Sequence, residues 1–531
     1  MHDFIECGTS PKPLNFTSLK TRYIEEKQAE KTHVILCYKQ RRANVTVKIE
    51  QFNVTEIIEK AKAVLADQNR ISPELKIMFE LLLTIISLMA GRLSLSSRNS
   101  SKPPSADPNR GKGNKGTTNN KPGGQAGRIG KNLKPVENPD NIIPIEVDKS
   151  TLPPGNYRAS GFEARQVVDL KISRIITEYR AEVLENDKGK RYVAVFPDGL
   201  TRPIQYGKSV KSHAVYLSQY QLIPYERVED YFVNEIQIPV SVGSLFNFNK
   251  EAYDLLEPFA ALAKDKLIQG TLIHADETGI NVNGKRIWLH NASNELWTYF
   301  YPHEKRGSIA MDEIGILPNF NGTLVHDHWK PYYIYTCRHG LCNAHHIREL
   351  QWVMDNPGFV WAKNMQELLI EMRDAVAASE TNTVVGEAEV VFRERYRQII
   401  KEGQAEMPLT PEKPKDADGK VKRGKVKKTK ELNLLERLRD FENDTLLFMV
   451  DPEVPFTNNR GENDIRMTKV QQKISGCFKS MEGAKMFCRI RSYLLTAQKH
   501  DVSPTDALQC LFDGKLPAVF FKDESNPAVC Y

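Results

Sequence analysis

The chain has 531 residues, too many for one domain, and 40% of them are hydrophobic, which is enough for several buried cores. Its net charge of +7 is unevenly spread, because residues 98–134 and residues 413–430 each hold nine Lys or Arg. Such blocks favour contact with a polyanion, with solvated linkers as the alternative.

Cysteine usage and apolar runs exclude two classes of protein. The eight cysteines are scattered without a Cys-x-x-Cys pair, which argues against a disulfide framework and favours a reducing compartment. The first residues lack a signal-peptide pattern, and the most apolar window, residues 77–90, is interrupted by Glu80 and too short to span a bilayer. We therefore expect a cytoplasmic protein with no membrane partner.

The N-terminal part is predicted to be helical after an unassigned segment, residues 1–54. Within residues 55–95, Ser72-Pro73-Glu74 is typical of a helix start, and the residues that follow carry a broad apolar face. That face must be buried, either against a second copy or on its own domain. Residues 96–140 are rich in Ser, Gly, Pro, Asn and Lys and predict a flexible basic linker.

Residues 141–255 are predicted to form a small α+β domain. Strand-like alternation runs to about residue 206, and two helices follow at residues 225–235 and 241–251. A short break near Pro239 makes this pair a candidate helix-turn-helix for binding DNA ends. The same pattern is common in proteins that bind nothing.

The order of elements over residues 256–353 is informative. A short apolar strand ends at Asp276, a hairpin marked by Asn283-Gly284 follows, and a third strand and a helix lead to an apolar strand before Asp327. That is the order of an α/β core of the ribonuclease-H-like class. In such a core the two Asp-bearing strands are neighbours, so we expect their ends to present both carboxylates together.

Residues 354–445 interrupt this core with charged helices, which we expect at residues 365–378, 387–401 and 432–443. Helices suit an insertion that must not disturb a sheet. The core resumes over residues 446–504, where a helix follows Asn458-Asn459, and residues 505–531 form a C-terminal tail.

Three acids distant in the sequence form the candidate catalytic and metal site. Carboxylate oxygens are the ligands that Mg²⁺ prefers, and two such ions suit attack on a phosphodiester. We assign Asp276 to bridge two Mg²⁺ ions, with Mn²⁺ as a substitute, and Asp327 and Glu462 to complete one side each. Glu277 and Asp464 are the alternatives to their neighbours, and a lone Asp at a strand end is commonly a turn former.

Soft ligands lie soon after the second Asp. Cys342 and His345 are close in sequence to Cys337 and His339, which would allow a zinc site. The irregular spacing and the lack of a Cys pair disfavour zinc. We expect Cys342 to be buried and His345 to hydrogen-bond near the acids.

A basic stripe follows the third acid. Arg466, Lys469 and Lys473 share one helix face with Glu462, which predicts a grip on the DNA strand that is cut. A surface helix with an ordinary Glu–Arg pair is the alternative. The two basic runs add further predicted DNA contacts at six residues: Arg110, Lys112, Lys115, Lys422, Arg423 and Lys425.

Several motifs together carry a family resemblance. They are residues 97–105, 216–225 and 274–278, residues 341–345 with Arg348, and Asn458-Asn459 with Glu462 and Arg466. At these positions the sequence resembles the bacterial insertion-sequence transposases of the IS66 family, over about residues 60 to 500. The resemblance implies a DDE-type enzyme with a ribonuclease-H-like core, Mg²⁺ dependence, and strand cleavage and transfer at terminal inverted repeats. By motif, its catalytic acids are the same three.

The resemblance also implies partners. These are double-stranded DNA at the element ends and at the target, small accessory proteins of the same element, and, because two ends are joined, further copies of the chain in a homo-oligomer. The bound protein would be associated with the nucleoid.

One departure from the family stands out. Its members often carry a Cys-rich zinc-binding segment before the core, whereas residues 141–206 hold no cysteine, so end recognition is expected to use another surface. A structure-specific nuclease on the same core and a non-catalytic DNA-binding relic are the alternative functions. The long insertion and the basic linker favour the transposase, and the intact acid set argues against the relic.

Overall fold

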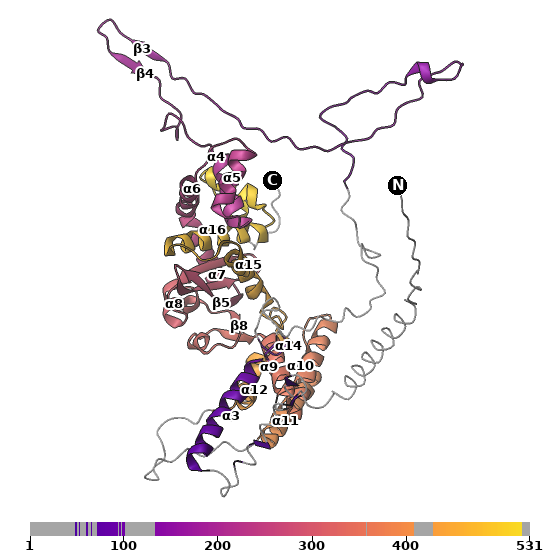
Figure 1. The fold of residues 1–531 in the computed structure, drawn as a ribbon, viewed down its shortest axis with the longest axis vertical. Helices are drawn as coiled ribbons and strands as arrows, with labels where there is room; N and C mark the ends of the chain where they lie inside the picture. The colour runs from indigo at the N-terminus through magenta and orange to yellow at the C-terminus, as the bar shows by residue number, and fades with distance from the viewer. Residues whose placement is uncertain are drawn as a thin grey trace, which may run out of the picture. The chain divides into compact units, whose positions relative to one another are not determined.

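The computed structural model divides the chain into two compact units (Figure 1). The first comprises Met1–Arg110 and Ala260–Lys469, and the second Gly111–Phe259 and Val470–Tyr531. The structure describes residues 48–49, 52–53, 60–61, 65, 72–93, 95–96, 98–100, 133–356, 358–407 and 428–522.

A five-stranded mixed sheet organises the first unit. Its strands lie in the order β7-β6-β5-β8-β9, with β5, β6 and β7 antiparallel, β8 parallel to β5, and β9 parallel to β8. The strands are β5 (Leu272–Val282), β6 (Lys285–Ser293), β7 (Thr298–His303), β8 (Thr323–His326) and β9 (Arg338–Leu341). The expectation that the two Asp-bearing strands are neighbours is therefore confirmed.

The hairpin between β5 and β6 turns where the sequence predicts it. Asn283 and Gly284 both have positive φ, 48° and 80°, which a tight two-residue turn requires. One detail of the prediction was wrong: β5 does not end at Asp276 but continues to Val282, because its second half pairs with β6 after its first half has paired with β8.

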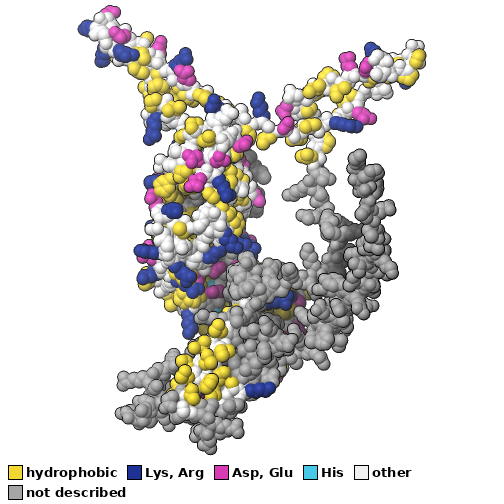
Figure 2. Space-filling view, viewed as in Figure 1, with side chains coloured by type: hydrophobic (Ala, Val, Ile, Leu, Met, Phe, Trp, Pro, Cys, Tyr) yellow, Lys and Arg dark blue, Asp and Glu magenta, His cyan; other side chains and the backbone are white. Residues whose placement is uncertain are grey.

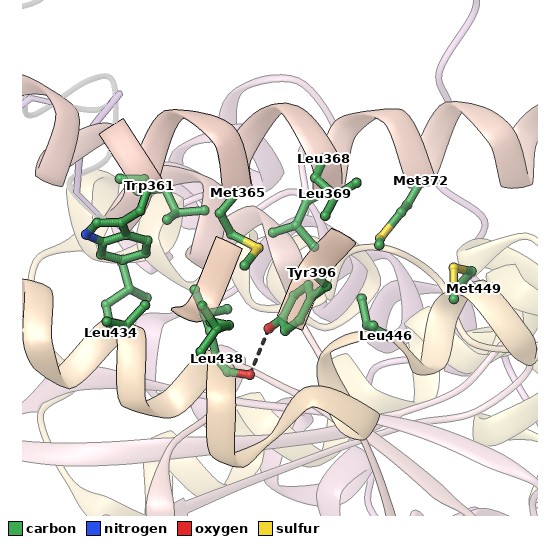
Figure 3. Packing of buried hydrophobic residues seen from close by; sticks show 14 of the residues in the cluster. Trp361, Met365, Leu368, Leu369, Met372, Tyr396, Leu434, Leu438, Leu446 and Met449 are labelled. Carbon is green, nitrogen blue, oxygen red and sulfur yellow. Dashed lines mark hydrogen bonds between the residues drawn. The ribbon is translucent and has the colours of Figure 1, made fainter. Parts of the chain in front are cut away.

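The predicted insertion, residues 354–445, is helical and packs on a hydrophobic core that also includes Val325 of β8. Its elements are α10 (Val360–Ala378), α11 (Glu387–Glu406), α12 (Lys430–Asp440) and α13 (Glu442–Thr445). Helix α9 (Asn343–Asp355) precedes it and α14 (Leu447–Val450) follows it. Figure 3 shows Trp361, Met365 and Met372 of α10 facing this core, where the Tyr396 hydroxyl donates to the Leu438 carbonyl at 2.8 Å. The three helices expected here are confirmed.

The N-terminal helix is α3 (Pro73–Leu93), and it begins as expected. Ser72 Oγ accepts a hydrogen bond from the Leu75 N–H at 3.4 Å, as a capping residue does. Most of its described apolar side chains are exposed, with Ile77 and Met78 each 66% accessible, and they form a patch in Figure 2. Two short paired strands, β1 (Lys48–Ile49) and β2 (Phe52–Asn53), lie in the segment that the sequence left unassigned.

Helices also build the second unit. They are α4 (Lys208–Val215), the π-helix η3 (Tyr216–Tyr220), α5 (Tyr225–Asn234), α6 (Val242–Leu255), α16 (Met481–Lys499) and α17 (Pro504–Phe512). The two helices of the candidate helix-turn-helix, α5 and α6, are present with the break between them at Pro239. The C-terminal tail begins in α17, where Leu508 and Leu511 are buried, so this part of it is packed.

Residues 141–206 contain far less sheet than the alternation suggested. Regular strand is confined to the hairpin of β3 (Val183–Glu185) and β4 (Arg191–Val193), and η2 (Lys149–Thr151) is a single 3₁₀ turn. Alternation yields a stable strand only where a partner and a covering layer exist, and here side chains such as Val195 are 95% exposed. None of the helices in the described part of the chain has the length and apolarity to cross a membrane.

Candidate functional site

The sheet places two of the three acids at matching positions. β5 and β8 pair in parallel with His274 opposite Val325, and Asp276 and Asp327 each lie two residues beyond that pair. Backbone N–H groups hold both carboxylates: Glu277 donates to Asp276 Oδ1 at 2.8 Å and Trp329 donates to Asp327 Oδ1 at 3.1 Å. The expected juxtaposition of Asp276 and Asp327 is therefore present.

The buried Asn458 brings the third acid to the other two. Its Oδ1 lies 2.8 Å from His274 Nδ1, and its Nδ2 donates to the Ala275 carbonyl at 2.8 Å, one residue before Asp276. Asn458 also precedes α15 (Asn459–Ser475), and its carbonyl accepts from the Glu462 N–H at 3.1 Å. The start of α15 is thus fastened to β5, which carries Glu462 to the strand that bears Asp276.

The three acids also interact electrostatically. Burial raises the pKa of Asp276 well above its ordinary value, and the negative charges of Glu277, Asp327 and Glu462 raise it further. Burial, followed by repulsion from Glu277, raises the pKa of Asp327 to about 6. Burial and mutual repulsion disfavour the ionised form of these acids, and a cation bound between them would stabilise that form.

Glu277, the alternative to Asp276, is engaged elsewhere. Its side chain is only 1% exposed; Arg306 donates to its Oε1 from Nε at 2.8 Å, and the Tyr332 hydroxyl donates to its Oε2 at 2.6 Å. The Arg306 guanidinium in turn lies over Trp329, 4.2 Å from the ring centroid. Both carboxylate oxygens of Glu277 therefore accept hydrogen bonds from neighbouring side chains.

Asp464 is separated from Glu462 by helix geometry. Residues that are two positions apart in an α-helix lie about 200° apart around its axis. The side chains of Glu462 and Asp464 therefore leave α15 in nearly opposite directions. Glu462 is the one whose charge acts on Asp276.

Two soft ligands reach Glu462. One ligand atom each from Cys342, His345 and Glu462 lie within 4.8 Å of one another. His345 Nδ1 is 3.9 Å from Glu462 Oε1, and both atoms are buried without a hydrogen-bond partner. Burial, with the positive charge of Arg348, lowers the pKa of His345 to about 4, so the imidazole is neutral at pH 7.

The four-ligand zinc set considered from sequence does not assemble. His339 Nδ1 pairs with His326 Nε2 at 3.0 Å, and Cys337 is buried outside the group around Glu462. Cys342 is buried, as expected. What sequence reasoning missed is that Glu462 joins Cys342 and His345; the available signal was their Cys-x-x-His spacing at the start of a helix.

The basic stripe on α15 is exposed at all three positions, Arg466, Lys469 and Lys473. The Lys469 ammonium donates to the Gly279 carbonyl of β5 at 2.5 Å, so that side chain is partly held against the sheet. The predicted DNA contacts in the two basic runs lie outside the described residues: Arg110, Lys112, Lys115, Lys422, Arg423 and Lys425.

Comparison with known proteins identifies the family. The family model described as Transposase IS66 family matches residues 203–486, more than half of the chain and the whole range that contains the three acids. A search of curated proteins finds no match. The chain therefore belongs to the IS66 family of transposases.

Proposed function

We propose that the chain is a DDE-type transposase that cleaves DNA at terminal inverted repeats and transfers the strand to a target, using Asp276, Asp327 and Glu462. One observation carries the proposal: parallel pairing of β5 with β8, together with the Asn458 clamp, brings three acids into one site across gaps of 51 and 135 residues (327 − 276 and 462 − 327). Buried acids that raise one another's pKa, as these do, cluster at functional sites.

The sheet order supports a ribonuclease-H-like core. Three antiparallel strands are followed by two parallel ones, with the first strand of the core at the centre. The first four of these strands and the neighbouring positions of β5 and β8 agree with the order expected from the sequence. The insertion follows α9, and its helices pack on a hydrophobic core that also includes Val325 of β8. The sheet carries Asp276 and Asp327, and the inserted residues are helical, as expected of a catalytic core with a helical insertion.

The donor set fits hard divalent cations on its Asp276 and Asp327 side. Both supply carboxylate oxygens held by backbone N–H groups, and Glu462 Oε1 is buried with no partner of its own. When bound, two Mg²⁺ or Mn²⁺ ions would activate the attacking oxygen and stabilise the leaving oxygen. Asp276, whose pKa is raised by the charges of both Asp327 and Glu462, would be a ligand to both ions.

The remaining residues position DNA. Arg466 and Lys473, exposed on α15 beyond Glu462, would pair with phosphates of the strand that is cut, and Lys469 would do so on leaving Gly279. The α5–α6 pair is the proposed surface for the element ends. Joining two ends calls for at least two copies of the chain, with the accessory proteins of the same element as further partners.

Strand transfer in vitro tests the proposal. The substrate is a DNA fragment that ends in the repeats flanking the gene, with Mg²⁺ and the two neighbouring small gene products, and with Asp276→Ala alongside. Joined product from the wild type and none from the variant is the expected result. Cutting without joining would favour a nuclease, and DNA binding without chemistry, in Mn²⁺ as well, would leave a relic.

A further inference from the structure

The strongest feature not used so far is the group formed by Cys342, His345 and Glu462. We propose that these three side chains form a binding site for a thiophilic divalent cation of the zinc class, distinct in ligand chemistry from the oxygen site of Asp276 and Asp327. It supplies one sulfur, one nitrogen and one oxygen, a set that suits zinc and is a poor match for magnesium.

The separations suit one ion. Zinc bonds of about 2.0 Å to nitrogen and oxygen and about 2.3 Å to sulfur place tetrahedral ligand atoms roughly 3.3 to 3.7 Å apart. The three ligand atoms here lie within 4.8 Å of one another, and His345 Nδ1 is already 3.9 Å from Glu462 Oε1. Shifts on the order of 1 Å would bring the three atoms to the separations of tetrahedral ligands.

Two of the three ligand atoms are buried polar atoms without a hydrogen bond. Glu462 Oε1 and His345 Nδ1 are buried and neither makes a hydrogen bond. A buried polar atom left in this state costs about 1 to 3 kcal/mol. One cation between them would satisfy both atoms.

The ligands are held by rigid elements. Cys342 is the N-cap of α9 and His345 lies in the first turn of that helix, while Glu462 lies in the first turn of α15. The Asn458 N–H donates to Cys342 Sγ at 3.1 Å, so the residue that fastens α15 to β5 also orients the sulfur. Outer contacts of this kind fix the direction of a metal ligand.

Binding has a defined proton balance and leaves one position open. The S–H bond of Cys342 breaks, an S–metal bond forms, and the proton leaves to the buffer. Three protein ligands around a tetrahedral ion leave the fourth position for water or a phosphate oxygen.

The site shares Glu462 with the proposed catalytic set, which gives it a consequence. A zinc-class ion held by Cys342 and His345 withdraws Glu462 from the magnesium site, so it would inhibit strand transfer in competition with Mg²⁺. This consequence, unlike the binding itself, rests on the proposed function.

Cobalt binding tests the site without DNA or catalysis. The reduced full-length protein is titrated with Co²⁺, and the thiolate-to-cobalt charge-transfer band in the near ultraviolet is recorded. We expect a band that saturates near one ion per chain, is lost in Cys342→Ser, and weakens at least tenfold in apparent affinity in Glu462→Gln. Cys337→Ser and His346→Gln are matched controls, because both residues are buried neighbours outside the group.

Two results would overturn the proposal: no band in the wild type, or a band that persists in Cys342→Ser. Circular dichroism checks that each variant is folded. If Cys342→Ser does not fold, the half-buried Glu462→Gln replaces it as the test of the site. The consequence is tested by the ratio of strand transfer with and without Zn²⁺ in each protein, which should fall in the wild type and stay near one in Cys342→Ser. An inactive wild type would count against the proposed function and leave the cobalt result standing.

Discussion

At the residue scale, Asp327 is an acid whose charge the fold disfavours. Its folded pKa is about 6 against an ordinary 3.8. The neutral carboxyl therefore contributes stability that is fully present below pH 3.8 and is lost as the pH rises through about 6. Asp327→Asn should stabilise the metal-free protein at pH 7 by up to about 3 kcal/mol, with little effect near pH 4.

Urea unfolding at the two pH values measures this difference. Asp265→Asn on α7 (Glu257–Ile268) is the control, because the same substitution is made there at an exposed position. An equal effect of Asp327→Asn at pH 4 and pH 7 would show that its charge is not the cause.

Substitution of Glu277 should change the unfolding free energy differently from substitution of its sequence neighbour Asp276. Glu277→Ala leaves the Tyr332 hydroxyl and the Arg306 guanidinium without their acceptor, so we expect a loss of about 2 to 3 kcal/mol in unfolding free energy. Asp276→Asn removes a repelled charge and should not destabilise the metal-free protein. If Glu277→Ala unfolds at the wild-type urea concentration, the assignment of Glu277 to structure is incorrect.

These two acids mark a limit of sequence reasoning. Asp276 and Glu277 are adjacent acids in the same strand, so no local pattern shows which of the two is the proposed metal ligand and which is held by other side chains. The two acids are distinguished by Arg306 and Tyr332, which hydrogen-bond to Glu277 and lie 29 and 55 residues after it in the chain. Asp276 was preferred from sequence; its partners in space became visible only with the fold.

At the element scale, Asn458 couples β5 to α15 through hydrogen bonds of its side chain and its backbone. Asn458→Ala should weaken metal binding by about 10- to 100-fold, because the Glu462 helix loses its fixed distance from Asp276. Mn²⁺ titration followed by electron paramagnetic resonance measures the affinity. Asn459→Ala, at the exposed next position, is the control and should bind as the wild type does.

The insertion is sensitive to volume where α10, α11 and α12 meet. A Cβ on Gly403 would lie 2.8 Å from Leu435 Cδ1 and 3.0 Å from Trp361 Cγ. Gly403→Ala should therefore destabilise the protein by about 1 to 3 kcal/mol, although alanine is the better helix former by about 1 kcal/mol. Thermal unfolding compares Gly403→Ala with Gln404→Ala, a substitution at the exposed next position. If Gly403→Ala is more stable than the wild type, the side chains of Leu435 and Trp361 move to make room for the added methyl group.

Elements differed in how far the sequence determined them. The insertion helices were predictable because a 3.6-residue apolar period is local to each helix. Strand β9 was not predicted, since its four residues Arg338–Leu341 become a strand only by pairing with β8. The alternation in residues 141–206 predicted more strand than exists, because alternation records the side chains and not whether a partner strand is available.

At the scale of the whole molecule, the basic runs should make DNA binding depend on salt. Replacing Lys422, Arg423 and Lys425 together by Gln should reduce the slope of log affinity against log salt by about 0.9 for each phosphate that is no longer neutralised, and so by up to about 3. Fluorescence anisotropy with a repeat-end duplex measures the slope. Lys363→Gln, whose ammonium lies 3.7 Å from Glu367, is the control; an unchanged slope in the triple variant would assign this run to solvation.

The separation of Asp327 and Glu462 also orders events during synthesis. The sheet strands and both Asp residues emerge from the ribosome first, and 135 further residues (462 − 327) must follow before the third acid exists. At roughly 5 to 20 residues per second, that interval is about 7 to 27 seconds. A nascent or prematurely terminated chain would therefore carry the strands of the core without Glu462, and under the proposed function it would lack one of the three acids that DNA cleavage requires.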